Sequence, residues 1–192
     1  MRVILIGDSN VARVREAMRT LDSGLELRII SVGSQSNAVW EVYLQRRAEF
    51  QHFQPDMIVV HMGHNDAVWH PRRNRVPRHP MEVFGIVSGY IGQIQSDFPQ
   101  TKVVQSNPFP RNAGPHLSGL PLHRYNMMVY EFGLVLRDQS LERNRNIVLN
   151  RVLWEKPSEG LANAMMFEND GLHLNFCGSC SVAAAWLRVF RR

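Results

Sequence analysis

Apolar stretches with strand character alternate along the chain with stretches of helical periodicity. The pattern predicts five strands, at Arg2–Ile6, Leu25–Val32, Met57–Met62, Lys102–Ser106 and Asn146–Leu149. It predicts five helices, at Asn10–Leu21, Ala38–Phe53, Met81–Phe98, Leu122–Gln139 and Phe176–Phe190. Strands that alternate with helices favour an α/β fold, in which helices cover both faces of a parallel sheet.

The number of strands narrows the topology. Right-handed crossovers leave few arrangements, and five strands suit the flavodoxin-like order 2-1-3-4-5 of a three-layer, doubly wound sheet. In that order the carboxyl ends of the first three strands lie side by side. Ligands of such sheets bind at that edge, so the residues that follow these strands are the first candidates for function.

The composition fits a single domain over residues 1–192. The chain is 44% hydrophobic and 20% charged, which supplies a core and excludes a disordered or collagen-like chain. Its longest uninterrupted apolar run, Val182–Leu187, is far shorter than the ~20 residues of a membrane-spanning helix. No signal sequence precedes the first predicted strand, so we expect an intracellular (cytoplasmic) protein or a domain of a larger intracellular protein.

A glycine and then small polar residues follow each of the first three predicted strands. These segments are Gly7-Asp8-Ser9-Asn10, Gly33-Ser34-Gln35-Ser36-Asn37 and Gly63-His64-Asn65-Asp66. A fourth segment, Asp170-Gly171-Leu172-His173, comes just before the last predicted helix. Because glycine lets the backbone turn sharply or approach a ligand closely, we expect the strand-end segments to form a site at one edge of the sheet.

These residue types together meet the requirements of nucleophilic acyl transfer. A serine hydroxyl is a weak nucleophile, and His173 is the candidate base that activates Ser9. Asp170 is placed to hold the imidazole in the right tautomer and to stabilise its charged form. The candidate oxyanion donors are the backbone N–H groups of Ser9 and Gly33 and the side-chain amide of Asn65. This chemistry needs no cofactor, and we predict no metal site.

The same segments resemble the sequence blocks of the SGNH hydrolases, the GDSL esterase/lipase superfamily. The family is named for four residues, which are matched here by Ser9, Gly33, Asn65 and His173. Asp170 matches the acid of the family's D-x-x-H block. The resemblance implies a serine esterase that forms an acyl-enzyme on Ser9 and hydrolyses carboxylic esters with short acyl or acetyl groups, or lipid esters.

One position departs from the family pattern, because Asn10 stands where the name GDSL implies leucine. The early first strand, the GDSN and GHND segments and the excess of arginine are similar to the esterase domain in first-open-reading-frame proteins of LINE-type retrotransposons. The chain is also similar to intracellular platelet-activating-factor acetylhydrolases. These narrower resemblances imply cleavage of lipid or acetyl esters and association with membranes or RNA.

Positive charge also bears on the partners. The formal net charge is +5, and 20 of the 22 basic residues are arginine. Residues 70–80 include four arginines and follow the Asn65 segment, so Arg72 and Arg73 are candidate substrate contacts, together with the nearby His64 and Trp69. We expect these arginines to form a positively charged rim beside the site, which attracts phosphate-bearing lipid head groups, an anionic membrane surface or RNA. A solvated basic loop is the alternative interpretation.

Two alternatives to the esterase hypothesis stay open on the sequence. In the first, Ser9 serves only as the N-cap of the helix that begins beside it. In the second, the chain is a non-catalytic binding module that uses the same crevice and the arginine-rich rim for RNA or anionic lipid.

Overall fold

The computed structural model describes residues 1–63, 65–66, 78–113, 121–143 and 146–190. Its main sheet consists of β1 (Arg2–Gly7), β2 (Glu26–Ser31), β3 (Met57–His61), β4 (Lys102–Ser106) and β5 (Asn146–Val148). All paired neighbours in this sheet are parallel, and the order is β2-β1-β3-β4-β5. The predicted α/β class and strand order are therefore confirmed.

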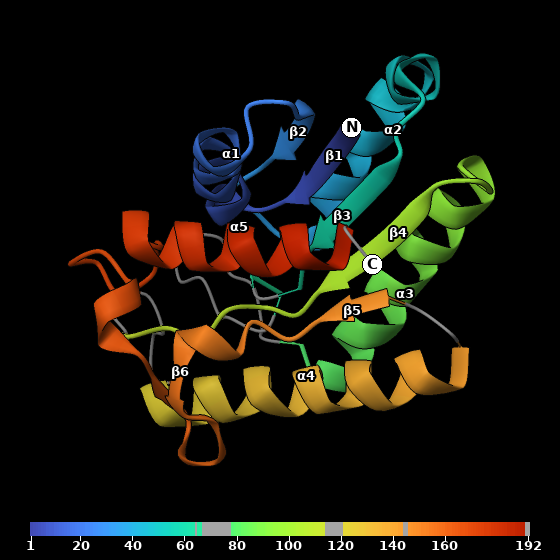
Figure 1. The fold of residues 1–192 in the computed structure, drawn as a ribbon. Helices are drawn as coiled ribbons and strands as arrows, with labels where there is room; N and C mark the ends of the chain where they lie inside the picture. Colours follow the sequence, from blue (N-terminus) through green and yellow to red (C-terminus); the bar gives the residue numbers. More distant parts are fainter. Residues whose placement is uncertain (64, 67–77, 114–120, 144–145, 191–192) are drawn as a thin grey trace.

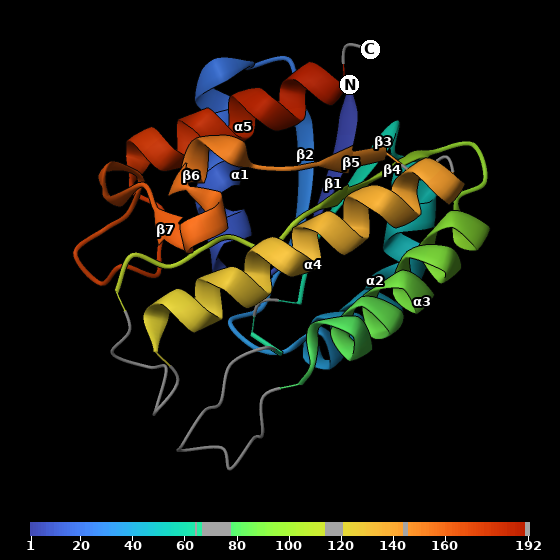
Figure 2. The ribbon, with the colours of Figure 1, turned by 90° about the horizontal axis from the view of Figure 1, so that it is seen from below.

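Helices cover both faces of the sheet (Figures 1 and 2). One face carries α1 (Ser9–Leu21) and α5 (Phe176–Phe190), and the other carries α2 (Ser36–Phe53) and α3 (Pro80–Asp97), with α4 (Leu122–Arg143) beside α3. The central strand β1 supplies both layers, because successive side chains of a strand point to opposite faces. Its Val3 and Leu5 belong to the core under α1 and α5, whereas Ile4 and Ile6 belong to the core under α2 and α3.

The stretch 151–169, which lies between the last predicted strand and the last predicted helix, contains several short elements that the sequence pattern does not predict. It comprises η2 (Arg151–Leu153), β6 (Trp154–Lys156), η3 (Pro157–Glu159), β7 (Leu161–Ala162) and η4 (Ala164–Met166). The strands β6 and β7 form a small antiparallel pair. Elements of two or three residues are too short to show a hydrophobic period, so the sequence gives no signal for them.

The carboxyl ends of β2, β1 and β3 stop at the same level. In the register of the sheet, Gly7 at the end of β1 lies between Ser31 of β2 and His61 of β3. A Cβ atom at Gly7 would lie 2.2 Å from the carbonyl oxygen of His61, so only glycine fits where β1 turns into α1. The three polar segments that follow these strands therefore leave from one edge, as the sequence predicts. Among the described helices, none combines the length and apolar character needed to cross a bilayer.

Candidate active site

Ser9 is the first residue of α1, and Asp8 is the N-cap of that helix. The Asp8 carboxylate accepts a hydrogen bond from the Asn10 amide at 2.8 Å, and the Asp8 carbonyl accepts one from the Val11 amide at 3.1 Å. The alternative in which Ser9 is the cap is therefore wrong, and its hydroxyl is not consumed by the helix end. In the described part of the chain, the Ser9 amide donates to no acceptor, and it lies at the positive end of the helix dipole.

The structure brings Ser9, His173 and Asp170 into hydrogen-bond contact. Ser9 Oγ lies 3.0 Å from His173 Nε2, and His173 Nδ1 lies 2.6 Å from Asp170 Oδ2. A carboxylate can only accept, so Nδ1 carries the proton in this contact. In the neutral imidazole, Nε2 then presents its lone pair to the Ser9 hydroxyl, which is the arrangement that a general base needs.

Hydrogen bonding keeps Asp170 ionised. Its partial burial raises the pKa, but hydrogen bonds from the His173 side chain and from the backbone amides of His173 and Leu172 outweigh that effect and lower the pKa from 3.8 to about 2. The Asp170 and His173 side chains are 44% and 26% exposed, so the pair faces solvent. A charged Asp170 thus accompanies His173 across the ordinary pH range.

The loop that carries Asp170 and His173 has a backbone that requires glycine. Gly171 has a φ of +63°, and a Cβ atom there would lie 2.3 Å from the Ala113 amide nitrogen. The Asn112 amide donates to the Gly171 carbonyl at 2.8 Å. The segment after β4 therefore packs against this turn and supports it from one side.

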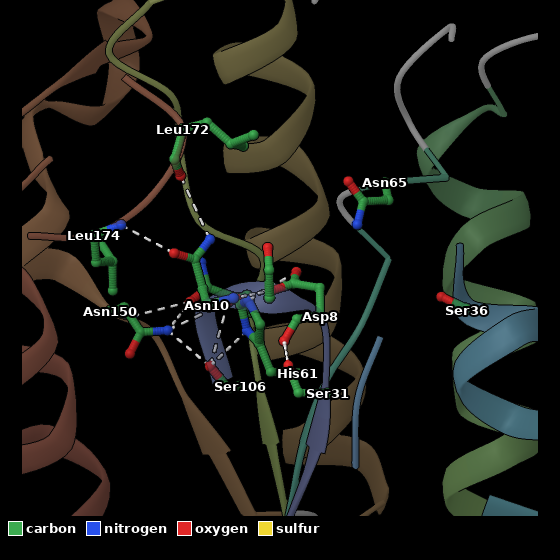
Figure 3. A network of polar contacts seen from close by, with 12 residues as sticks. Asp8, Asn10, Ser31, Ser36, His61, Asn65, Ser106, Asn150, Leu172 and Leu174 are labelled. Carbon is green, nitrogen blue, oxygen red and sulfur yellow. Dashed lines mark hydrogen bonds and ion pairs between the residues drawn. The ribbon is translucent and has the colours of Figure 1, made fainter. Parts of the chain in front are cut away.

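Asn10 holds the other side of the same loop, a role that its position in the sequence does not predict. Asn10 is buried, its Oδ1 accepts from the Leu174 amide at 2.9 Å, and its Nδ2 donates to the Leu172 carbonyl at 3.4 Å (Figure 3). One side chain thus grips the residues before and after His173. The leucine that the family name implies here has neither a donor nor an acceptor in its side chain. Asparagine at this position therefore adds two hydrogen bonds that hold the His173 loop.

The predicted oxyanion donors Asn65 and Gly33 follow neighbouring strands at the same sheet edge, but they differ in hydrogen bonding and exposure. Asn65 Nδ2 donates to the Ser34 carbonyl at 2.9 Å, which uses one of its two hydrogens and leaves the other for a ligand. Ser34, Asn65 and Asp8 line one small hollow, so the loops after β1, β2 and β3 converge. Gly33 is exposed and is not among the residues that line this hollow.

Asp66 anchors the Asn65 segment to α2. Its Oδ2 accepts hydrogen bonds from the Ser36 amide at 3.0 Å and from the Ser36 hydroxyl at 2.7 Å. Both Asp66 and Ser36 are buried, and Figure 3 places Ser36 and Asn65 together on the α2 side of the site. This contact fixes the loop that presents the Asn65 amide.

A second polar array lies below Ser9 in the interior. Asp8 Oδ2 is 3.5 Å from His61 Nε2, and His61 Nδ1 is 3.2 Å from Ser106 Oγ. The Asn150 side-chain amide donates to Ser106 Oγ at 2.9 Å (Figure 3). It also donates to Asn107 Oδ1 at 2.9 Å. His61 falls within the predicted strand Met57–Met62, and the local pattern gives no signal for this array, because its partners Asp8 and Ser106 are distant from it in the sequence.

All four predicted substrate contacts lie outside the described residues: His64, Trp69, Arg72 and Arg73. In the described ranges, no group of three or more His, Cys, Asp or Glu side chains is arranged to hold a metal ion.

Comparison with known proteins places the fold. A GDSL-like lipase from Bacteroides thetaiotaomicron is similar to this chain with a TM-score of 0.76 and 15% identity, over 99% of this chain and 87% of that one. A proposed SGNH hydrolase from Slackia heliotrinireducens gives a TM-score of 0.67 and 14% identity, over 99% and 98%. The acetyl xylan esterase AlAXEase gives 0.67 and 19% identity, over 98% and 99%. The sequence itself matches no protein-family model and no curated protein. The chain therefore has the fold of the GDSL-like lipases and SGNH hydrolases.

Proposed function

We propose that this protein is a serine esterase of the SGNH type that hydrolyses carboxylic esters. The observation that carries the proposal is the hydrogen-bonded series from Asp170 through His173 to Ser9, with distances of 2.6 and 3.0 Å. The half-buried Ser9 and His173 stand at the sheet edge where α/β folds bind their ligands. The solved structures of similar fold include a lipase and an acetyl xylan esterase, which supports the reaction class.

The first half of the reaction makes an acyl-enzyme. Ser9 Oγ attacks the ester carbonyl carbon while its proton passes to His173 Nε2, and Asp170 stabilises the imidazolium. The new oxyanion receives hydrogen bonds from the Ser9 amide and from the second N–H of Asn65, with Gly33 as a further donor. His173 then returns the proton to the alcohol oxygen, the carbon–oxygen bond breaks, and the alcohol leaves.

The second half regenerates the enzyme. A water molecule gives a proton to His173 Nε2 and attacks the acyl carbon of the Ser9 ester. Collapse of the second tetrahedral intermediate breaks the bond to Ser9 Oγ, which recovers the proton from His173. The product is a carboxylic acid, which releases its proton to solvent and becomes a carboxylate, and each catalytic group ends in its starting state.

Replacement of the nucleophile tests the proposal. Ser9→Ala should lower kcat on p-nitrophenyl acetate by at least roughly 10³-fold, as in measured triads, because the oxygen that carries the acyl group is gone. A fluorophosphonate probe should label the wild-type protein and leave Ser9→Ala unlabelled. The matched control is Ser96→Ala, which removes an exposed hydroxyl on α3 and should keep both activity and labelling.

The same assay identifies the acyl group. We propose acetyl or another short acyl chain as the substrate class, and p-nitrophenyl esters of graded chain length measure it directly. Hydrolysis by a folded Ser9→Ala protein at the wild-type rate would overturn the assignment of Ser9. A preference for long chains would retain the esterase and replace the short-chain proposal by a lipase.

A further inference from the structure

A pocket away from Ser9 opens between α4 and the segment that follows β5. Its volume is about 140 Å³, and α4 contacts η3 and β7 of that segment. Neither Ser9 nor His173 lines it, because it lies at the ends of β4 and β5 rather than at the end of β1. A cavity of about 150 Å³ holds benzene, so this one can take a ring-sized ligand.

An unused hydrogen-bond donor faces this pocket from Asn107. The residue is 4% exposed, and its Oδ1 accepts a hydrogen bond from the backbone amide of Asn150 at 2.9 Å. This bond fixes the orientation of the Asn107 side chain. Its Nδ2 lies against Gly133 of α4, where a Cβ atom would stand 3.2 Å away. Within the described residues, Nδ2 donates to no acceptor, although both Asn107 and Gly133 line the pocket. The Nδ2 group is therefore open to the pocket, where an acceptor from a ligand can replace water.

The charge around the pocket is positive. Arg137 and Arg151 both line it. Arg137 forms an ion pair with Asp138 at 2.9 Å, whereas the structure gives the guanidinium of Arg151 no carboxylate partner in the described part of the chain. One positive charge therefore stays uncompensated here. Guanidinium groups bind carboxylates through paired hydrogen bonds, so an anionic acceptor fits this rim.

The remaining walls are apolar, which limits the kind of anion. They are formed by Tyr130, Leu134, Leu149, Trp154 and Pro157. The rings of Tyr130 and Trp154 meet edge to face with centroids 5.9 Å apart, so this wall is a packed aromatic surface. An inorganic anion would leave these walls facing water, whereas an organic anion covers them with its own apolar body.

We propose that this pocket binds a small organic carboxylate with a ring-sized apolar body. Asn107 Nδ2 donates to the carboxylate, the two arginines supply the opposite charge, and the apolar body packs against Tyr130 and Trp154. Gly133 keeps the donor accessible, because a side chain at this position would cover Asn107 Nδ2. This inference does not depend on ester hydrolysis, since none of the pocket residues is hydrogen-bonded to Ser9, His173 or Asp170.

Titration of the whole protein with benzoate tests the proposal. The probe is the indole N–H resonance of Trp154, assigned through Trp154→Phe. We expect a saturable shift with a Kd on the order of 1 mM or below, since a ligand of this size gains only a few kcal/mol. Benzyl alcohol, which has the same ring without the charge, should bind at least about tenfold more weakly, because it forms no charged hydrogen bonds.

Two variants locate the binding. Arg151→Gln should weaken benzoate binding by about tenfold, because it removes the unpaired charge. Gly133→Ala should weaken it as well while leaving the unfolding midpoint unchanged or higher, because alanine favours the helix and shields Asn107. The control, Arg19→Gln, removes an exposed arginine of α1 and should leave binding unchanged.

The outcomes that overturn the proposal are equally definite. They are no saturable Trp154 shift up to about 10 mM benzoate, equal binding of benzyl alcohol, or equal binding of inorganic phosphate. Unchanged benzoate affinity in folded Arg151→Gln would also refute the site. Each of these measurements leaves the Ser9 assay unaffected, so failure here is distinguishable from failure of the proposed esterase.

Discussion

Two Asp-His-Ser arrays meet at the turn after β1, one facing solvent and one buried. The outer array consists of Asp170, His173 and Ser9. The inner array consists of Asp8, His61 and Ser106. In the outer array the side chains of the carboxylate and the histidine are 44% and 26% exposed, whereas those of the inner pair are 4% and 1% exposed and Ser106 is buried. The same three residue types therefore occupy opposite environments within one site.

Geometry separates the two arrays further. The outer contacts measure 2.6 and 3.0 Å, and the inner contacts measure 3.5 and 3.2 Å. The inner hydroxyl, Ser106 Oγ, also accepts from Asn150, and no substrate reaches a residue that is 1% exposed. Residue type alone thus does not identify a catalytic triad. We infer that the inner array instead holds Asp8, whose other oxygen caps α1 at Ser9.

The largest expected effect on stability comes from breaking the inner array. His61→Leu removes the ring that faces the Asp8 carboxylate and leaves a buried charge without its histidine. The free energy of unfolding should fall by about 3–5 kcal/mol, as for other buried pairs that lose one partner. Urea unfolding followed by circular dichroism measures this loss.

The control is His52→Leu, since His52 is exposed on α2 and should change stability by less than about 0.5 kcal/mol. Adding Asp8→Asn to His61→Leu should recover part of the loss, because asparagine still caps a helix but carries no charge. A loss below about 1 kcal/mol in His61→Leu would show that the inner array is dispensable.

The sequence predicts the outer array and misses the inner one for a physical reason. Ser9, Asp170 and His173 occur in short segments with fixed spacing, and the alternation of strands and helices brings those segments to one sheet edge. His61 lies inside an apolar run and contacts Ser106, which is 45 residues away. Such a pairing depends on strand register and on packing, which the local pattern does not encode.

Asn10 likewise has a partner that the local sequence pattern does not predict, although it lies next to a predicted catalytic residue. It directly follows Ser9, yet its partner Leu174 is 164 residues away. The short pair β6–β7 has no sequence signal for a different reason, because its strands span only three and two residues. The sheet order, by contrast, follows from rules that apply to the whole chain, since every parallel crossover has the same hand.

A smaller effect is expected from a variant that loosens the loop carrying His173 and leaves Ser9, His173 and Asp170 unchanged. Asn10→Leu leaves the Leu174 amide and the Leu172 carbonyl without their partner, so the loop that carries His173 loses its anchor. We expect the free energy of unfolding to fall by about 1–3 kcal/mol. We also expect kcat to fall by roughly 10–100-fold, because a misplaced base is less effective. The p-nitrophenyl acetate assay and urea unfolding measure the two effects.

Asn112→Ala is the matched control for Asn10→Leu. Asn112 contributes its backbone amide to Gly171 while its side chain is exposed, so its replacement keeps the loop contact. Both kcat and stability should stay close to the wild type. An Asn10→Leu protein with wild-type kcat would mean that the His173 loop holds its geometry without this clamp.

The smallest expected effect is a titration shift within the outer array. The pKa of Asp170 is about 2, below its ordinary 3.8, so its ionised form stabilises the fold fully above pH 3.8 and that contribution is lost as the pH falls through about 2. His173→Ala removes the side-chain hydrogen bond, the largest of the effects that lower this pKa, and the midpoint should rise toward 3.8. The backbone amides of residues 172 and 173 still donate to the carboxylate, so the rise should be incomplete.

Carbon-13 NMR of the labelled aspartate carboxyls, assigned through Asp170→Asn, follows the titration, and His52→Ala should leave it unchanged. Because Asp170 is exposed and screened by solvent, the accompanying change in stability should be small, and an unmoved midpoint in His173→Ala would mean that His173 does not hold the carboxylate in its charged form.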